Sequence, residues 1–279
     1  MRTVTTIAAA REWRNGLGGR VGLVPTMGYL HAGHGSLVRR ARGECQHVVA
    51  TVFVNPTQFG AGEDLARYPR DLARDQALLG GAGCDVLFAP RVSEVYPPGF
   101  ETAVDAGSVS SPLEGERRPG HFRGVATVVL KLFGMLQPQR AYFGRKDAQQ
   151  LAVIRRMVRD LDVPVEVVGC PTVREADGLA MSSRNAYLDA EERRAAPVLF
   201  RALMRAQALW DAGSRDPEGL RQVMRATLAV EPRARVDYVS VADPLTFHEL
   251  AAPAGSALAS LAVFIGKARL IDNVALGEG

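Results

Sequence analysis

Two histidines three residues apart, His31 and His34, follow an apolar run of the chain. The run is Val21–Pro25, and Gly28 lies between it and the histidines. A short apolar run that ends at a proline predicts a buried strand, and the glycine predicts a tight turn before a helix. Because the first N–H groups of a helix lack partners and carry partial positive charge, they favour an anion. Two imidazole donors there indicate a phosphate site; the alternative is a helix cap or a surface pair.

Further groups of polar side chains follow other predicted strands along the chain. They are Asn55 with Gln58, Lys146 with Asp147 and Gln150, and Arg174 with Ser182, Ser183 and Arg184. In an open parallel sheet, ligands bind beyond the carboxyl ends of the strands. We therefore expect these groups and the two histidines to line one composite pocket.

The types of these side chains suit a ligand that combines phosphates with small polar groups. Gln58 and Gln150 each offer two donors and one acceptor without charge, which suits hydroxyl and carboxylate oxygens; the alternative is exposure to solvent. Lys146 can hold phosphate charge, and Asp147 either contacts a ribose or only caps the following helix. The hydroxyls and the guanidinium of Ser182–Arg184 can bind a triphosphate, or the segment is an ordinary loop.

The elements that must position these side chains alternate between strand and helix in the first part of the chain. Strands are predicted at 21–25, 48–54, 85–89, 141–143 and 165–168, with a short edge strand at 102–105. Helices are predicted at 34–44, 122–136 and 147–160, and a mostly helical stretch at 64–79 is expected to be broken at Tyr68-Pro69. This alternation predicts an α/β fold with a parallel sheet and right-handed crossovers. The polar segment Leu113–Gly120 is expected to be a flexible loop that could cover the pocket.

The pattern changes near residue 172. Two amphipathic helices are predicted at 190–212 and 217–229, and short strands at 236–241, 258–264 and 270–274. Helices followed by antiparallel strands indicate an α+β arrangement. We therefore expect a Rossmann-like domain over residues 1–172, which binds the ligands, and a smaller C-terminal α+β domain over residues 173–279, which acts as a lid.

Composition narrows the class of protein. Of the 279 residues, 47% are hydrophobic and 23% charged, which is typical of soluble globular proteins. The longest apolar run, Leu258–Ile265, is too short to span a bilayer, and Met1–Trp13 lacks the apolar core of a secretory signal. We therefore expect no membrane partner and a cytoplasmic protein.

Cysteine usage and charge agree with that expectation. Cys45, Cys84 and Cys170 are odd in number and far apart, so neither a disulfide framework nor a zinc knuckle is indicated. The net charge is +4, but the basic residues are scattered and are not interleaved with stacking aromatics. This pattern argues against a nucleic-acid partner.

The string PTMGYLHAGH, at 25–34, resembles the H-x-G-H signature of adenylate-forming nucleotidyltransferases with a Rossmann-like sheet. The strings FVNPTQF, EDLARYPR, RPGHFRGVATVV, FGRKDAQQL and DGLAMSSRN follow in the order and rough spacing of pantothenate synthetases, also called pantoate–β-alanine ligases. The resemblance covers nearly the whole chain. Two positions depart from the family's pattern: Arg145 stands where Glu or Gln is commoner, and Met181 stands where Leu is commoner, a volume-conserving exchange.

The resemblance implies an ATP-dependent ligase that joins pantoate to β-alanine through a pantoyl adenylate and releases AMP and pyrophosphate. It also implies Mg²⁺ and a homodimer. The acidic stretch that includes Asp75 is a candidate for holding Mg²⁺, and no individual metal ligand is assigned. By the same resemblance, Gln58 would contact pantoate and β-alanine, and Gln150 would contact pantoate.

The resemblance also assigns ATP-binding and catalytic residues. His34 would act as proton donor, and His31, Lys146 and the Ser182–Arg184 segment would balance charge on the triphosphate. The implied ATP-binding residues are Met27, Gly28, Tyr29, Leu30, His31, Ala32, Gly33, His34, Gly144, Arg145, Lys146, Asp147, Val173, Met181, Ser182, Ser183 and Arg184.

Two other functions fit parts of the sequence. A nucleotidylyltransferase would keep the fold but retain AMP in its product. A basic RNA-binding protein would need a clustered basic face and a strong dependence on salt.

Overall fold

The computed structural model describes residues 1–277 and contains two compact units. The first comprises Met1–Arg145 and Gln149–Pro171. The second comprises Lys146–Ala148 and the chain from Thr172 onward. The short segment Lys146–Ala148 therefore packs with the second unit, although its neighbours in sequence belong to the first.

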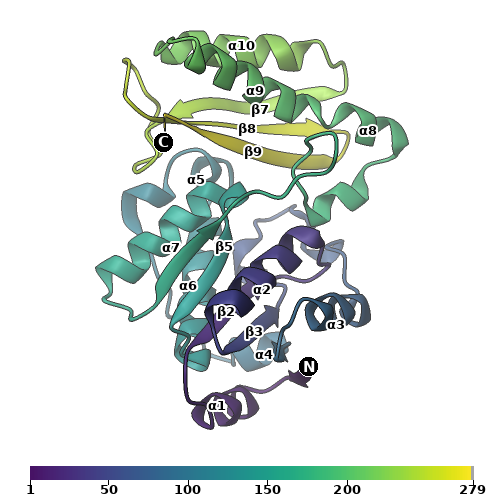
Figure 1. The fold of residues 1–279 in the computed structure, drawn as a ribbon, viewed down its shortest axis with the longest axis vertical. Helices are drawn as coiled ribbons and strands as arrows, with labels where there is room; N and C mark the ends of the chain where they lie inside the picture. The colour runs from purple at the N-terminus through teal and green to yellow at the C-terminus, as the bar shows by residue number, and fades with distance from the viewer. Residues whose placement is uncertain (278–279) are drawn as a thin grey trace. The chain divides into compact units, whose positions relative to one another are not determined.

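The first unit is built on a six-stranded parallel sheet (Figure 1), which confirms the predicted fold class. Its strands are β1 (Arg2–Val4), β2 (Val21–Thr26), β3 (His47–Val52), β4 (Val86–Phe88), β5 (Arg140–Gly144) and β6 (Glu166–Cys170). Their spatial order is β1-β4-β3-β2-β5-β6, and all their pairings are parallel. The central strands are apolar on both faces because helices cover both: Leu23, Val24 and Val49 are all fully buried.

Helices connect these strands. They are α1 (Ile7–Asn15), α2 (Ala32–Glu44), α3 (Leu72–Gly81), α4 (Val92–Val95), α5 (Glu114–Arg117), α6 (His121–Leu136) and α7 (Ala148–Asp160). Short 3-10 turns occur at η1 (Pro56–Gln58), η2 (Asp64–Ala66), η3 (Gly107–Ser110) and η4 (Arg145–Asp147). Helix α2 packs closely on β2 at Gly22, where a Cβ atom would lie 3.0 Å from Cys45 Sγ and 3.1 Å from the ring of Tyr142.

The sequence-based expectations for this unit miss one strand and predict another that is absent. Strand β1 was not predicted, because it has only three residues, two of them exposed; it pairs with β4 at the edge of the sheet. The segment 102–105 forms no strand, and the Val104 N–H donates to the hydroxyl of Thr127 on α6 instead. The expected break at Tyr68-Pro69 is confirmed, since it separates the turn η2 from α3, which begins at Leu72.

The polar segment Leu113–Gly120 is also more ordered than expected, since it contains α5 and a buried glutamate, Glu114. Gln149 on α7 holds this segment. Its side-chain amide donates to Val109 O (3.0 Å) and Pro112 O (2.7 Å) and accepts from Glu114 N (3.1 Å). These three hydrogen bonds restrain the backbone where the segment begins and in the residues just before it.

The second unit combines helices with a three-stranded antiparallel sheet, as the sequence predicts. Its elements are η5 (Ser183–Tyr187), α8 (Ala190–Ala195), α9 (Val198–Asp211), α10 (Pro217–Ala229), β7 (Ala234–Ala242), β8 (Ala257–Ile265) and β9 (Ala268–Leu276). The helix predicted at 190–212 is interrupted, because Pro197 has no N–H with which to continue α8.

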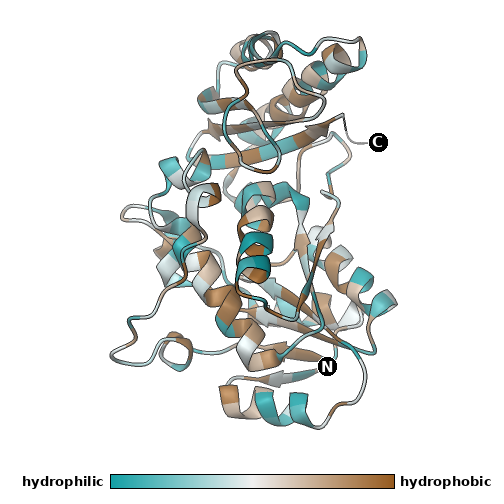
Figure 2. Ribbon diagram, turned by 90° about the vertical axis from the view of Figure 1, so that its left-hand side faces the viewer, coloured by the Kyte–Doolittle hydropathy of each residue, from teal (hydrophilic) through white to brown (hydrophobic). Residues whose placement is uncertain are grey.

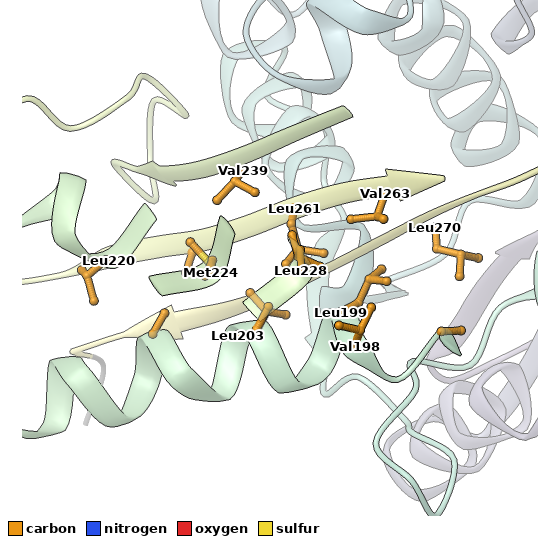
Figure 3. Packing of buried hydrophobic residues seen from close by; sticks show 14 of the residues in the cluster. Val198, Leu199, Leu203, Leu220, Met224, Leu228, Val239, Leu261, Val263 and Leu270 are labelled. Carbon is orange, nitrogen blue, oxygen red and sulfur yellow. The ribbon is translucent and has the colours of Figure 1, made fainter. Parts of the chain in front are cut away.

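The core of the second unit lies between its helices and one face of its sheet. Helices α9 and α10 pack on that face (Figures 1 and 3). Figure 3 shows Leu203, Leu220 and Met224 of the helices pointing toward Val239 and Leu261 of the strands. Burial of these aliphatic side chains stabilises the unit by roughly 1.5–3 kcal/mol each.

Hydropathy follows the same arrangement. Helices in Figure 2 carry hydrophobic and hydrophilic residues side by side, as expected of helices with one buried and one exposed face. Among residues 1–277, no helix is both long and apolar enough to cross a membrane.

Candidate active site

The turn after the central strand β2 holds an unusual backbone conformation. Gly28 has φ 91° and Tyr29 has φ 52°, so two successive residues lie in the left-handed region. A Cβ atom at Gly28 would lie 2.9 Å from Val52 Cγ1, so only glycine fits there. The strain at Tyr29 is offset by Asp75 of α3, whose carboxylate accepts from Tyr29 N (2.9 Å) and Leu30 N (2.7 Å).

Asp75 therefore has a structural task at this turn. Its side chain is almost completely buried, and burial raises the pKa of its carboxyl, although the hydrogen bonds from Leu30 and Tyr29 act in the opposite direction. Both carboxylate oxygens are engaged by backbone N–H groups of the turn. Asp75 therefore shapes the turn, and the Mg²⁺ role considered for it from sequence stays a prediction.

The two histidines lie at the beginning of α2 and contact each other. Their ring centroids are 4.1 Å apart. His31 is the N-cap, and its Nδ1 accepts from Gly33 N at 3.2 Å. His34 lies in the first turn, and its Nδ1 accepts from His31 N at 3.3 Å. The pair therefore does cap the helix, which was the alternative interpretation.

Capping also determines which ring nitrogen of each imidazole carries the proton. Since the Nδ1 atoms of His31 and His34 both accept from backbone N–H groups, the proton of each neutral ring is on Nε2. In that form, the N–H of each ring is on Nε2. The cap uses Nδ1 of each imidazole, and the phosphate contact predicted from sequence would use Nε2.

Gln58, expected to contact a substrate, is buried in the turn η1 that follows β3. Its Oε1 accepts from Asn55 Nδ2 at 3.1 Å, and its Nε2 donates to Met27 Sδ at 3.2 Å. A thioether is a weak acceptor, so a ligand oxygen can replace it at little cost. Gln58 and Met27 thus lie together at the ends of β3 and β2, and exposure of Gln58 to solvent is excluded.

Three residues that sequence reasoning left without a role hold the backbone of Gln58. His121, at the start of α6, donates from Nδ1 to Gln58 O at 2.8 Å, and Arg118 Nη1 donates to His121 Nε2 at 3.1 Å. Arg118 in turn forms a bidentate pair with Glu63, at 2.9 and 2.8 Å. Burial, with the nearby Arg118 charge, lowers the pKa of His121 to about 4, so its ring is neutral at pH 7. The string RPGHFRG, which begins a helix with a histidine, was the available signal.

Gln150, the other glutamine expected to contact a substrate, lies half-buried on α7 of the first unit. It directly follows Gln149, which anchors the segment around α5. The helix that carries Gln150 is therefore fastened to that segment.

Lys146 is held within the second unit by its backbone. Its carbonyl accepts from Asn273 Nδ2 of β9 at 2.7 Å, while its Nζ lies 3.7 Å from Asp147 Oδ1. The side chain of Lys146 is 18% exposed, and that of Asp147 is 46% exposed. The ammonium is thus only weakly engaged by its neighbour and can meet another anion.

The loop that bears Ser182, Ser183 and Arg184 follows a short hairpin. Arg174 and Ala180 form an antiparallel bridge, and Met181 N donates to Val173 O at 3.0 Å. Arg174 is fixed by a bidentate pair with the buried Asp272 of β9, at 2.6 and 3.0 Å. Strand β9 therefore anchors two segments: Asp272 holds this hairpin, and Asn273 holds the Lys146 segment.

The loop itself begins as a capped turn. Ser182 Oγ accepts from Arg184 N at 3.3 Å at the start of η5, and Ser183 is buried. Lys146 and Ser182 line the same small cavity, with Asn185 and Asp272, and its volume of about 10 Å³ is roughly that of one water molecule. Asn185 Oδ1, buried, has no hydrogen-bond partner among the residues that the structure describes, so a water in this cavity would satisfy it.

The predicted ATP-binding residues are thus divided between the two units. Those of the first unit are Met27, Gly28, Tyr29, Leu30, His31, Ala32, Gly33, His34, Gly144 and Arg145, and those of the second are Lys146, Asp147, Val173, Met181, Ser182, Ser183 and Arg184. Within each unit, residues far apart in sequence are brought together, as the Gln58–Met27 and Lys146–Asn273 contacts show.

A parallel sheet whose central strand ends in an H-x-G-H turn, with imidazole donors at the following helix, defines a nucleotide-binding α/β protein of the H-x-G-H type. The particular family follows from comparison. The model of the family described as Pantoate-beta-alanine ligase matches residues 2–275, and the chain belongs to this family.

Individual relatives agree in sequence and in structure. A pantothenate synthetase of Roseiflexus sp. (strain RS-1) is 64% identical over 276 residues, which are 99% of each chain. The crystal structure of pantothenate synthetase from Thermus thermophilus has a TM-score of 0.94 at 54% identity and covers 98% of this chain and 99% of its own. The pantoate-beta-alanine ligase of Francisella tularensis was solved in complex with beta-gamma ATP and beta-alanine. Its TM-score is 0.83 at 34% identity, and the match covers 100% of this chain and 98% of the Francisella chain.

Proposed function

We propose that this chain joins pantoate to β-alanine at the expense of ATP, forming pantothenate, AMP and pyrophosphate. Membership of the pantoate-beta-alanine ligase family supports the reaction. The observation in this chain that carries it is the turn after β2, where His31 and His34 both cap α2 through Nδ1 and Met27 contacts the buried amide of Gln58.

The chemistry has two steps because a carboxylate does not react with an amine in water. In the first, a carboxylate oxygen of pantoate attacks the α-phosphorus of ATP, the bond from that phosphorus to the bridging oxygen breaks, and pyrophosphate leaves. In the second, the amine of β-alanine attacks the acyl carbon of pantoyl adenylate. The acyl C–O bond breaks, AMP leaves and the amine loses a proton.

Neither step needs a nucleophile from the protein. The three cysteines are buried and free, and burial raises the pKa of both Cys84 and Cys170, so these thiols stay protonated. Catalysis then depends on positioning and on stabilising the charge of the transition state.

The first unit supplies imidazole and backbone donors. His31 and His34 donate Nε2–H bonds to phosphate oxygens, and the N–H groups at the start of α2 add partial positive charge. His34 is the group that gives its N–H to the oxygen on which charge accumulates as pyrophosphate leaves. Gln58 and Gln150 bind the hydroxyl and carboxylate oxygens of pantoate, and Gln58 also contacts β-alanine.

The second unit supplies charge and hydroxyls. Lys146 and Arg184 balance the negative charge of the triphosphate, and Ser182 and Ser183 donate to its oxygens. Gly144, Arg145, Asp147, Val173 and Met181 complete the ATP site. Strand β9 supports this half of the machinery through Asp272 and Asn273.

Mg²⁺ accompanies ATP in this proposal, and the fit of the chain to the ion can be tested on its side chains. Among residues 1–277 no three His, Cys, Asp or Glu side chains are grouped as metal ligands, and Asp75 is engaged by backbone N–H groups. These residues do not form a Mg²⁺ cage. The ion is therefore proposed to arrive on the phosphate oxygens, which is how Mg²⁺ usually binds nucleotides, and no catalytic step is assigned to a protein–metal bond.

Assembly and location complete the proposal. We propose a homodimer, for which light scattering should give about twice the 30.0 kDa of one chain. We also propose that the enzyme acts in the cytoplasm, where a reducing environment keeps its three free thiols reduced.

The reaction is tested by mixing the protein with ATP, Mg²⁺, pantoate and β-alanine and measuring AMP. AMP release that requires both acids supports the ligase. AMP that stays in the product would indicate a nucleotidylyltransferase. Salt-sensitive RNA binding without AMP release would indicate an RNA-binding protein.

A further inference from the structure

Asn55, between β3 and η1, has an amide whose oxygen and nitrogen ends can be told apart by the backbone groups that they meet. Its Oδ1 accepts from Thr57 N at 3.4 Å, and its Nδ2 donates to Gly124 O of α6 at 3.2 Å. A backbone N–H can only donate and a backbone carbonyl can only accept. The oxygen and nitrogen of this side chain therefore cannot exchange places without facing one repulsive contact at each end.

The orientation of Asn55 determines that of Gln58. Because Asn55 Nδ2 is a donor, the Gln58 atom 3.1 Å away must be its oxygen. The other end of the Gln58 amide, its NH₂ group, then faces Met27 Sδ. Gln58 thus offers N–H donors where we propose that pantoate binds, and it recognises an acceptor oxygen there rather than a donor hydroxyl.

Two hydroxyls also donate to Asn55 Oδ1: that of Thr57, at 2.9 Å, and that of Tyr96, at the end of α4. Tyr96 donates its O–H to Asn55 Oδ1 at 2.8 Å and also lies, through the same oxygen, 3.2 Å from Thr57 Oγ1. Its ring is packed between Phe53 (centroids 6.1 Å apart) and Phe100 (5.0 Å), with Lys131 Nζ 5.8 Å from its centroid. Burial raises the pKa of this phenol, so the O–H stays a donor throughout the neutral range.

We propose that Tyr96 is a positioning residue of the reaction, which acts through Asn55 to hold the Gln58 amide with its NH₂ end toward pantoate. This inference rests on the proposed contact between Gln58 and pantoate. Tyr96 itself touches no substrate in this account: a hydroxyl on a rigid aromatic ring fixes one amide, and that amide fixes the next.

A double-mutant cycle on Tyr96→Phe and Gln58→Ala tests the relay, with KM for pantoate, KM for ATP and kcat measured by pyrophosphate release. Tyr96→Phe should raise KM for pantoate about 3- to 10-fold, the size expected for one lost hydrogen bond between neutral groups. Its kcat and its KM for ATP should change less than about twofold. In the Gln58→Ala background the same substitution should have no further effect, because the amide that it orients is gone.

A second substitution tests which end of the Gln58 amide faces pantoate. Gln58→Glu keeps an acceptor for Asn55 Nδ2 but has no N–H to offer, so it should impair pantoate binding at least as much as Gln58→Ala. The matched control is Tyr142→Phe, which removes a hydroxyl from a fully buried tyrosine of the same unit that donates to Glu44 at 2.9 Å. It should leave KM for pantoate unchanged.

The outcomes separate the two levels of the proposal. If Gln58→Ala leaves KM for pantoate unchanged, the proposed role of Gln58 is wrong. If Gln58→Ala raises it but Tyr96→Phe does not, or if Tyr96→Phe acts equally in both backgrounds, the relay is wrong while the role of Gln58 stands. A Gln58→Glu variant that binds pantoate like the natural chain would overturn the donor orientation.

Discussion

The imidazole of His31 caps the helix on which His34 lies, and the ring of His34 in turn accepts from the backbone N–H of His31. This reciprocal arrangement uses Nδ1 of both rings for the helix and places the proton of both on Nε2. The H-x-G-H spacing is what allows the two residues to cap the helix reciprocally, since N-cap and third helical position are three residues apart, and we propose that the same residues contact phosphate through Nε2.

Replacement of His34 by alanine should reduce pyrophosphate release by on the order of 10²-fold or more, because a donor aimed at developing charge is lost. The measurement is single-turnover formation of pyrophosphate with saturating ATP and pantoate. His248→Ala, which changes an exposed histidine of the second unit, is the matched control and should be active. Near-normal turnover of the His34 variant would remove this residue from the mechanism.

Lys146→Ala should cause a loss of similar size, on the order of 10²-fold, because the ammonium balances triphosphate charge. The effect should appear in pyrophosphate release and not in the free energy of unfolding, since only a 3.7 Å contact with Asp147 is lost. Lys267→Ala, at an exposed turn, controls for the loss of a lysine. Equal activity of the two variants would contradict the role of Lys146.

Asp272→Asn should destabilise the second unit and weaken ATP binding together. The substitution removes the negative charge that compensates Arg174. Removing one partner of a buried ion pair lowers the free energy of unfolding by about 3–5 kcal/mol. We expect a value near the lower end, because the Arg174 side chain is 21% exposed. Urea unfolding and KM for ATP are the two measurements. A variant with an unchanged KM for ATP would show that the hairpin does not position the Ser182–Arg184 loop.

Asp75→Asn should show whether this carboxylate shapes the turn or binds metal. Its new NH₂ group would face the N–H of either Tyr29 or Leu30, and one buried N–H left without an acceptor costs about 1–3 kcal/mol. We expect a lower free energy of unfolding in the absence of both ATP and Mg²⁺. Unchanged stability combined with a raised requirement for Mg²⁺ would favour the metal role instead.

The stability of the protein should depend on His121 between pH 6.5 and about 4. The ordinary pKa of histidine is about 6.5, whereas the folded-state pKa of His121 is about 4, so below pH 6.5 the unfolded chain binds the proton more readily. The contribution of this residue is therefore complete above pH 6.5 and is lost as the pH falls. Between pH 7.5 and pH 5 the loss from this residue is about 2 kcal/mol.

The check on His121 is urea unfolding at both pH values in the natural chain and in His121→Asn. Asparagine can place an N–H near the position of Nδ1 and so keep the bond to Gln58 O, but it does not titrate. The drop in the free energy of unfolding should be smaller in the variant by about 2 kcal/mol. An equal drop in both proteins would assign the pH dependence to other groups.

Much of the fold could be predicted from local patterns. Runs such as Val48–Val54 are almost continuously apolar because both faces of a central strand are covered, and this signal needs no knowledge of the partners. Where the prediction was wrong, the deciding contact was distant in sequence. Val104 does not pair as a strand because Thr127 takes its N–H, and the segment at Leu113–Gly120 is ordered because Gln149 holds it.

The sequence by itself determined which chemistry this chain can carry: a histidine pair three residues apart, uncharged amides after strands, and a lysine and a Ser-Ser-Arg segment without any Gly-rich phosphate loop. These are properties of residue type and order, so they can be read along the chain. The tertiary structure alone decided how each group is presented. Nδ1 of His34 accepts a backbone N–H, which places the proton of the neutral ring on Nε2, and the amide of Gln58 turns its oxygen toward Asn55, which Gly124, Thr57 and Tyr96 contact. Donor and acceptor directions depend on partners brought together by folding, and no local pattern contains them.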